Sequence, residues 1–157
     1  MALRFVTIDE VQAQCRADGD DQANLLQYGE AAEDLAENIL NRRLSATDEA
    51  LIAMLAEGRT ELLASRTTYE EAVTAADGDV DLVALAFSNY RNTRTQAWQK
   101  LHAMKINSAI KGAILMIAAH MWNNRADVVS GQFAQAQEIP MNSRYVLQKY
   151  RHLEGTI

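Results

Sequence analysis

A single proline, Pro140, interrupts this chain of 157 residues. Proline and glycine are the residues that most strongly break helices, and with seven glycines besides that proline the chain can run through long uninterrupted helices. Apolar residues also recur at intervals of three and four, which is the spacing of one face of an α-helix. The sequence therefore predicts an all-α fold, a small helical bundle.

The composition is that of a compact domain. With 48% hydrophobic and 23% charged residues the chain can bury a core, and we expect residues 1–157 to form a single domain. The one cysteine, Cys15, cannot form an internal disulfide and is expected to be a small buried side chain. The first residues lack the apolar stretch of a secretory signal, and the apolar run at 113–119 is too short to cross a bilayer. These features predict a protein of the cytoplasm without membrane contact.

Capping patterns mark the first two helices. Thr7 and Glu10 have the spacing of a capping box, so a short helix is expected over residues 8–17, with Gly19 in the left-handed conformation that ends it. The next helix carries an apolar stripe over residues 25–40, and four carboxylates lie mostly off that stripe. These carboxylates are Glu30, Glu33, Asp34 and Glu37. The outer face of the second helix is therefore predicted to be acidic.

Residues 46–104 are predicted to form an inserted helical hairpin. Thr47 can cap a helix, and a separate short helix can start near Thr67. The Asp-Gly-Asp sequence at 77–79 breaks the pattern. Apolar and aromatic residues then recur over residues 80–101 as in a helix of about 20 residues.

The most apolar part of the chain, the alanine-rich run at 110–128, is predicted to be a long central helix. Asn107 or Ser108 can cap it, and its apolar surface is wide enough for burial on more than one side. A polar loop at 130–141 follows, and the Asn-Ser pair at 142–143 is expected to cap a last short helix.

The net charge of −6 is unevenly distributed. It is −7 over residues 1–40, −2 over residues 41–100 and +3 over residues 101–157. A protein that holds nucleic acid by its phosphates normally carries a basic patch, because affinity comes from the release of condensed counterions. The acidic first third argues against tight DNA binding, while contact with passing DNA remains compatible with it.

The sequence contains no motif for catalysis or metal binding. Its three histidines, His102, His120 and His152, are far apart, and neither a Glu-x-x-His sequence nor a cysteine pair accompanies them. There is no glycine-rich phosphate loop and no Gly-x-Ser-x-Gly sequence. His120 is expected to hydrogen-bond a neighbour rather than to bind a metal. We therefore expect a protein that is not an enzyme and holds no metal ion or cofactor.

Several segments stand in an order that resembles one known family. They are the alanine-rich run at 110–125, the Ile-Pro pair at 139–140 and the segment 146–151, preceded by the segments 8–11 and 16–21 and by the second helix. The chain resembles the tailed-phage head–tail connector family, also called head-completion or adaptor proteins. In that family an alanine-rich helix ends in an aromatic residue and an Asn-Arg pair, and the chain closes on a proline, a short helix and a Tyr-Arg.

Two features depart from the family pattern. Residues 46–104 stand where the family commonly has a short loop. Ala126 and Asp127 follow the Asn-Arg pair, where the family often has a glutamate.

The resemblance implies a non-enzymatic structural adaptor in the neck of a virion, assembled in the cytoplasm of a bacterial host. Such a protein forms a ring of about a dozen copies under the portal protein of a DNA-filled head. The ring extends the DNA channel, with DNA only as passing cargo, and presents a surface to the next neck or tail-completion protein. An acidic channel lining repels phosphate, so Glu30, Glu33, Asp34 and Glu37 are candidates for it. The alternative is that these carboxylates only solvate the second helix.

Six residues are candidates for contacts with the portal or with a neighbouring copy. They are Trp122, Arg125, Pro140, Tyr145, Tyr150 and Arg151. Trp122 and Arg125 have two interpretations: they fill the core and end the central helix, or Arg125 reaches an acidic neighbour in the ring. Residues 141–157 are expected to form a tail that docks onto the portal, because tyrosine and arginine are enriched where proteins meet.

Two other classes of function remain as alternatives. A helical DNA-binding regulator or a small DNA-packaging subunit needs a basic recognition face, and no predicted helix supplies one. A metal-dependent helical-bundle enzyme needs a stoichiometric metal ion.

Overall fold

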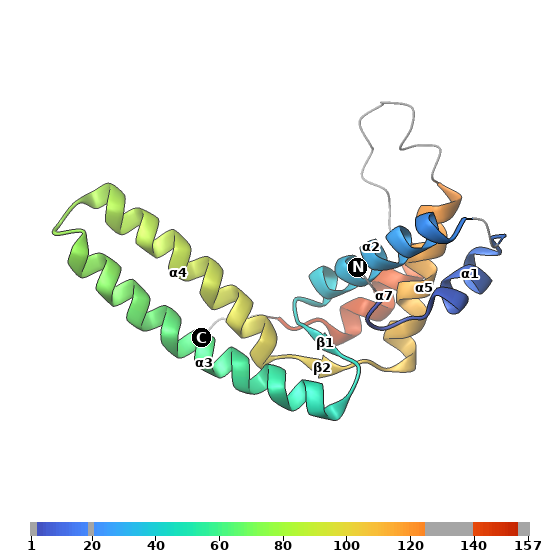
Figure 1. Ribbon diagram of the computed structural model, residues 1–157, viewed down its shortest axis with the longest axis horizontal. Helices are drawn as coiled ribbons and strands as arrows, with labels where there is room; N and C mark the ends of the chain where they lie inside the picture. Colours follow the sequence, from blue (N-terminus) through green and yellow to red (C-terminus); the bar gives the residue numbers. More distant parts are fainter. Residues whose placement is uncertain (1–2, 19–20, 125–139, 154–157) are drawn as a thin grey trace. The chain divides into compact units, whose positions relative to one another are not determined.

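The computed structural model describes residues 3–18, 21–124 and 140–153. Over these residues it contains six α-helices and one two-stranded sheet, so the predicted all-α fold is confirmed (Figure 1). The chain divides into two compact units. Unit 1 consists of Met1–Asn41 with Ile106–Ile157, and unit 2 consists of Arg42–Lys105. The predicted insertion, residues 46–104, falls within unit 2.

Four of the described helices belong to unit 1. They are α1 (Ile8–Cys15), α2 (Gln22–Leu40), α5 (Ser108–Asn123) and α7 (Met141–Tyr150). The first begins with the predicted capping box: the Thr7 hydroxyl accepts from the Glu10 amide at 3.2 Å, and the Glu10 carboxylate accepts from the Thr7 amide at 2.9 Å. Its end differs from the prediction, because Arg16 takes the left-handed conformation with φ 51° and Gly19 lies outside the described residues. The Arg16 amide donates to the Ala13 carbonyl at 3.3 Å and the Ala17 amide to the Gln12 carbonyl at 3.2 Å, which closes the helix after Cys15.

Helix α5 is the centre of unit 1, as the alanine-rich run predicted. It contacts α1, α2 and α7. Asn107 caps it by accepting a hydrogen bond from the amide of Ile110 at 2.9 Å. Its buried side chains are Ile110, Ala113, Ile114, Ile117, Ala118 and Trp122. The helix ends at Asn123, and the predicted continuation to Val128 lies outside the described residues.

Helix α7 starts earlier than predicted. Pro140 is its N-cap residue, and the Ser143 hydroxyl donates back to the Pro140 carbonyl at 2.7 Å. The expected cap by the Asn-Ser pair at 142–143 is therefore wrong. The fixed φ of proline suits the residue that leads into a helix, which explains the earlier start.

Unit 2 contains an antiparallel pair of long helices and a short parallel sheet. Its elements are β1 (Leu44–Ser45), α3 (Asp48–Ala75), α4 (Val80–Leu101) and β2 (Met104–Lys105). The two strands pair in parallel with Leu44 opposite Met104, and the hairpin α3–α4 is the crossover between them. Strands of two residues each leave no period-2 pattern in a sequence, so they were not predicted.

The predicted interruption of α3 near Thr67 is wrong, since α3 is one helix of 28 residues. Threonine can compete with the backbone ladder, but here the Thr67 and Thr74 hydroxyls donate to carbonyls four residues earlier, at 3.5 and 2.8 Å. Tyr69 also packs on α4. The predicted break at 77–79 is confirmed: Asp77 and Gly78 have positive φ, and Asp79 caps α4.

Small residues line the seam between α3 and α4. They include Gly58 and Ser65 of α3 and Ala86 and Ala97 of α4, all buried. At Gly58 the helices approach so closely that a Cβ atom would lie 2.8 Å from Cβ of Lys100 and 3.0 Å from the Ala97 carbonyl oxygen. The seam therefore depends on the absence of a side chain at Gly58.

Replacing Ile114 with aspartate is expected to lower the free energy of unfolding of unit 1 by several kcal/mol, because Ile114 is fully buried and an unpaired carboxylate would be desolvated. Thermal denaturation followed by circular dichroism measures this. The control is Ser108→Asp at the exposed start of the same helix, where a negative charge is favourable. An unchanged melting temperature for Ile114→Asp would show that the helix is not central.

Two glycine-to-alanine substitutions should have opposite signs. Gly58→Ala gains about 1 kcal/mol of helix propensity but overpacks the seam by about 1–3 kcal/mol, so a net loss of stability is expected. A Cβ at Gly112 of α5 meets no neighbouring atom within 4 Å, so Gly112→Ala should stabilise by up to about 1 kcal/mol. Chemical denaturation compares them, and equal stabilisation by both would contradict the close approach of α3 and α4.

Candidate functional site

The predicted acidic face of α2 is not a solvated face. Glu33 is 0% exposed and Glu37 is also buried, while Glu30 is half-buried. Asp34 alone among the four predicted channel residues has a largely exposed side chain, at 69%. The prediction that Glu33 and Glu37 line a channel is therefore wrong. The N-terminal segment covers both carboxylates.

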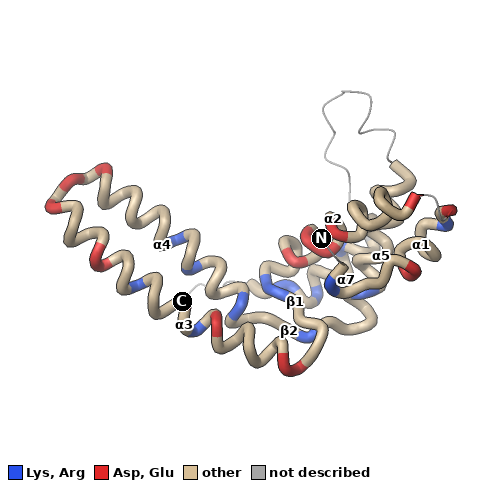
Figure 2. Tube along the Cα trace, viewed as in Figure 1, with Lys and Arg blue, Asp and Glu red and all other residues tan. Residues whose placement is uncertain are grey.

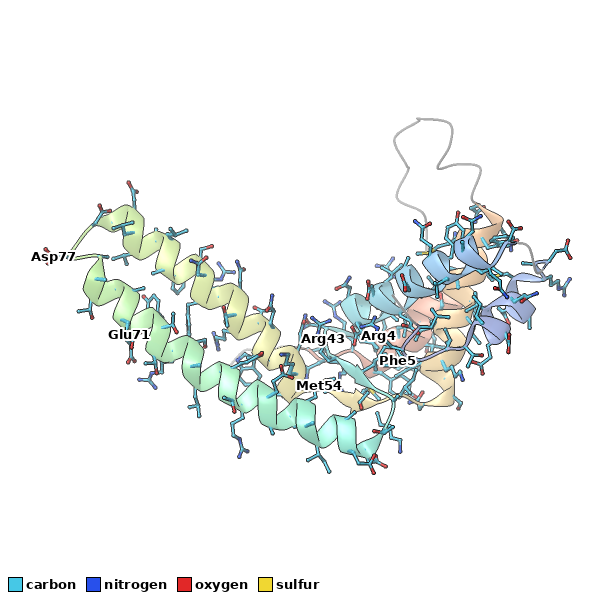
Figure 3. The ribbon with its side chains drawn as sticks, viewed as in Figure 1. Arg4, Phe5, Arg43, Met54, Glu71 and Asp77 are labelled. Atoms are coloured by element: carbon cyan, nitrogen blue, oxygen red, sulfur yellow. The ribbon has the colours of Figure 1, made fainter. Side chains whose placement is uncertain are left out.

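Glu33 binds the backbone of the N-terminal segment. Its carboxylate oxygens accept hydrogen bonds from the amide of Arg4 at 3.0 and 3.1 Å, from that of Phe5 at 2.7 Å and from that of Val6 at 3.1 Å. Arg4 and Phe5 are labelled in Figure 3. Three consecutive amides that would otherwise lack helix or sheet partners are satisfied by one side chain.

The Arg4 side chain neutralises the same carboxylates. Its guanidinium donates to Glu33 at 3.3 Å, to Glu37 at 3.2 Å and to Asp34 at 2.6 Å. Burial alone would lower the pKa of Arg4, but attraction to Glu37, the hydrogen bond to Glu33 and attraction to Asp34 outweigh it and raise that pKa above its ordinary value. This group, which we call the Arg4 cluster (Arg4, Glu33, Asp34 and Glu37), ties the N-terminal segment to α2.

The predicted interaction residues near the C-terminal end lie in different surroundings. Trp122 is buried in unit 1 and meets Tyr28 edge to face, with ring centroids 6.1 Å apart. Pro140 and Tyr150 are half-buried, whereas Arg151 is exposed. Arg125 lies outside the described residues.

Helix α7 presents an exposed aromatic residue while its other side is anchored. Tyr145 is 63% exposed, and the Lys149 ammonium lies 4.7 Å from the centre of its ring. Leu147 is fully buried. After the helix, the His152 amide donates to the carbonyl of Leu40 at 2.8 Å, which fixes the chain to the end of α2. The exposed surface of α7 is thus held on a rigid support.

The remaining titratable groups form no metal site within the described residues. No group of three or more histidine, cysteine, aspartate or glutamate residues there could hold a metal ion. His120 hydrogen-bonds the side chain of Asn124, and the ring of His102 stacks on Trp98 at 5.0 Å. Burial raises the pKa of the Cys15 thiol. Among the helices of the described part of the chain, none has both the length and the apolar character needed to cross a membrane.

Sequence reasoning missed the Arg4 cluster. The available signal was Arg4 itself, a cation in a strongly acidic first third, together with carboxylates at spacings of one and four on one helix. That spacing places Glu33 and Glu37 on one side of α2. It does not show which segment covers that side.

A comparison with protein-family models, with curated protein sequences and with solved structures finds no match for this chain.

Replacing Glu33 with alanine is expected to cost about 2–4 kcal/mol of stability, because the amides of residues 4–6 lose their acceptor and the Arg4 guanidinium loses one of its three carboxylate partners. Asp34→Asn is the matched control. It removes an exposed partner of the same arginine and should cost at most about 1 kcal/mol. Urea denaturation measures both, and equal effects would contradict the role assigned to Glu33.

Proposed function

We propose that the protein is a structural adaptor of a tailed-phage or prophage neck. In this role it forms a ring under the portal, extends the DNA channel and docks the next neck or tail component. The proposal has two supports: the order of segments that resembles the head–tail connector family, and the place of those segments in the fold.

The observation that carries the proposal is that the described parts of those segments all belong to unit 1. Helix α5, from the alanine-rich run, packs against α1, α2 and α7, which come from the other segments. The departure from the family pattern, residues 46–104, lies in unit 2. The insertion therefore leaves a continuous set of helix contacts among the segments that carry the resemblance.

The docking surface that fits this role is the exposed side of α7. Tyr145 of α7 and Arg151, which directly follows the helix, are exposed, and both are residue types enriched at protein interfaces. Because Leu147 is buried and His152 is bonded to Leu40, this surface is presented by a helix already fixed in unit 1. A surface that is already ordered before a partner binds loses little conformational entropy on binding.

The proposal is tested with DNA-filled, portal-bearing heads that lack neck proteins. We expect the purified protein to sediment with these heads and to form a ring visible by electron microscopy. It should not bind capsids that lack a portal. Failure of the protein to bind portal-bearing heads would contradict the proposal. If it instead retards duplex DNA in a gel, the DNA-binding alternative replaces the adaptor.

A double variant that carries Tyr145→Ala and Arg151→Glu should bind portal-bearing heads about tenfold more weakly or worse, with unchanged helicity and melting temperature. Gln14→Ala, at an exposed position of α1, is the control. Point substitutions are preferable to removing the tail, because the His152 amide bonds Leu40 and a truncation would also disturb unit 1. Normal binding of the double variant to these heads would exclude the exposed side of α7 as the docking surface.

A further inference from the structure

Helices α3 and α4 expose several of their large apolar side chains. The most exposed are Ile52, Leu63, Val80, Leu82, Leu85 and Phe87. The cause is the seam of small residues, which lets the two helices approach closely and leaves the large side chains on the outside. Large apolar side chains exposed side by side mark a surface that contacts another molecule.

Four arginines gather on one side of this hairpin. On α3, Arg59, Leu63 and Arg66 follow one another at intervals of four and three. On α4, Phe87, Arg91 and Arg94 do the same, and Figure 2 shows basic positions in the middle of both helices. We call this the arginine face: Arg59, Arg66, Arg91 and Arg94 with Leu63 and Phe87.

Contacts across the seam show that the α3 and α4 parts of the arginine face belong to one side. Tyr69 of α3 meets Phe87 of α4 edge to face, with centroids 6.3 Å apart. The pKa of Arg66 is raised by its hydrogen bond to Glu70, and Tyr90 of α4 lies near enough to contribute. Glu70 is the one acidic residue among the four arginines on that side.

The opposite side carries glutamates. Glu57 and Glu61 lie two residues before Arg59 and Leu63, and two residues turn a helix by about 200°. The Lys100 ammonium of α4 binds both, at 2.9 and 2.6 Å, which places them together on one side of the hairpin. Burial alone would lower the pKa of Lys100, but the hydrogen bonds to Glu61 and Glu57 raise it, so Lys100 is charged and offsets part of their charge.

Three other residues complete that side. Glu71 lies five residues after Arg66, and Leu82 and Leu85 lie five and two residues before Phe87. Glu71 is labelled on α3 in Figure 3. We call this the glutamate face: Glu57, Glu61 and Glu71 of α3 with Leu82 and Leu85 of α4.

The two faces lie at the same level along the hairpin. Gly58 lies against Ala97, and Tyr69 lies 5.1 Å from Tyr90. Arg91 and Arg94 are therefore level with the part of α3 between Gly58 and Tyr69. Glu61 lies within that part, and Glu57 and Glu71 lie just beyond its two ends. Two hairpins stacked side by side in the same direction would bring arginines of one opposite glutamates of the next.

We infer that the partner of this hairpin is a second copy of the chain, with the arginine face of one copy packed on the glutamate face of the next. The two faces differ, so the interface is heterologous, and repetition generates a ring or an open filament. Charge complementarity selects the register, and the exposed apolar side chains on both faces supply the area removed from water.

A nucleic acid is the other partner that four arginines would suit. The apolar side chains of Leu63 and Phe87 among them, and the pairing of Arg66 with Glu70 at 2.9 Å, favour a protein surface. The glutamate face also has no role in binding phosphate, whereas a second copy accounts for both faces. The inference extends the proposed ring but needs only that copies of the chain meet.

Charge reversal in two variants tests the interface. The first carries Arg59→Glu, Arg66→Glu, Arg91→Glu and Arg94→Glu. The second carries Glu57→Lys, Glu61→Lys and Glu71→Lys, with Lys100→Glu to preserve the internal ion pair in reversed sense. The control, which carries lysine in place of the same four arginines, retains the charge. Sedimentation velocity of the full-length proteins over a concentration series measures association, and circular dichroism verifies folding.

The wild type and the control are expected to associate, and each reversed variant alone should associate at least about tenfold more weakly. A mixture of the two reversed variants should restore assembly, because every interface in an alternating assembly then joins opposite charges. The inference is overturned by a wild type that stays monomeric at every concentration, by variants that assemble normally, or by a mixture without rescue. Loss of duplex DNA binding in the first variant, with assembly unchanged, would assign the arginine face to nucleic acid instead. Failure of the protein to bind phage heads would contradict the proposed function but would not affect the inference that copies of the chain meet through this hairpin.

Discussion

Unit 1 depends on the buried carboxylate of Glu33. Removing a carboxylate from water costs several kcal/mol, and here three amides and a guanidinium offset that cost. The same arginine reaches Glu37 and Asp34, so residues 4–6 are fixed along α2. Thr7 follows directly and caps α1, which packs on α5. The position of α1 against the central helix is thus set by a polar contact made before the helix begins.

Local patterns predicted the starts of three helices correctly. Thr7, Thr47 and Asn107 each accept the capping hydrogen bond that the sequence indicates. The break near Thr67 was wrong because packing of Tyr69 on α4 overrides local preference. Propensity is a weak guide where a side chain meets a partner distant in sequence.

The candidate surfaces were harder to predict than the fold. The apolar stripe of α2 identifies which residues lie off it, but the partner that buries Glu33 lies 27 to 29 residues away. Likewise Arg59 and Arg94 are separated by most of the hairpin in sequence. No run of basic residues indicates that they lie on the same side of it. Their grouping follows from the small seam residues, which fix the rotation of each helix about its axis. A sequence shows the spacing within one helix and not the rotation of one helix against another.

The interruption of unit 1 by residues 42–105 affects the order in which the chain acquires structure during synthesis. Helices α1 and α2 leave the ribosome first, but α5, which covers their apolar sides, is made only after the whole of unit 2. At about 5–20 residues per second this delay lasts several seconds. Over that interval α2 lacks the α5 surface on which it packs, while unit 2, being continuous in sequence, already has all of its parts. A nascent chain of this kind presents a completed hairpin beside an unfinished bundle, and the unfinished bundle is the part open to chaperones.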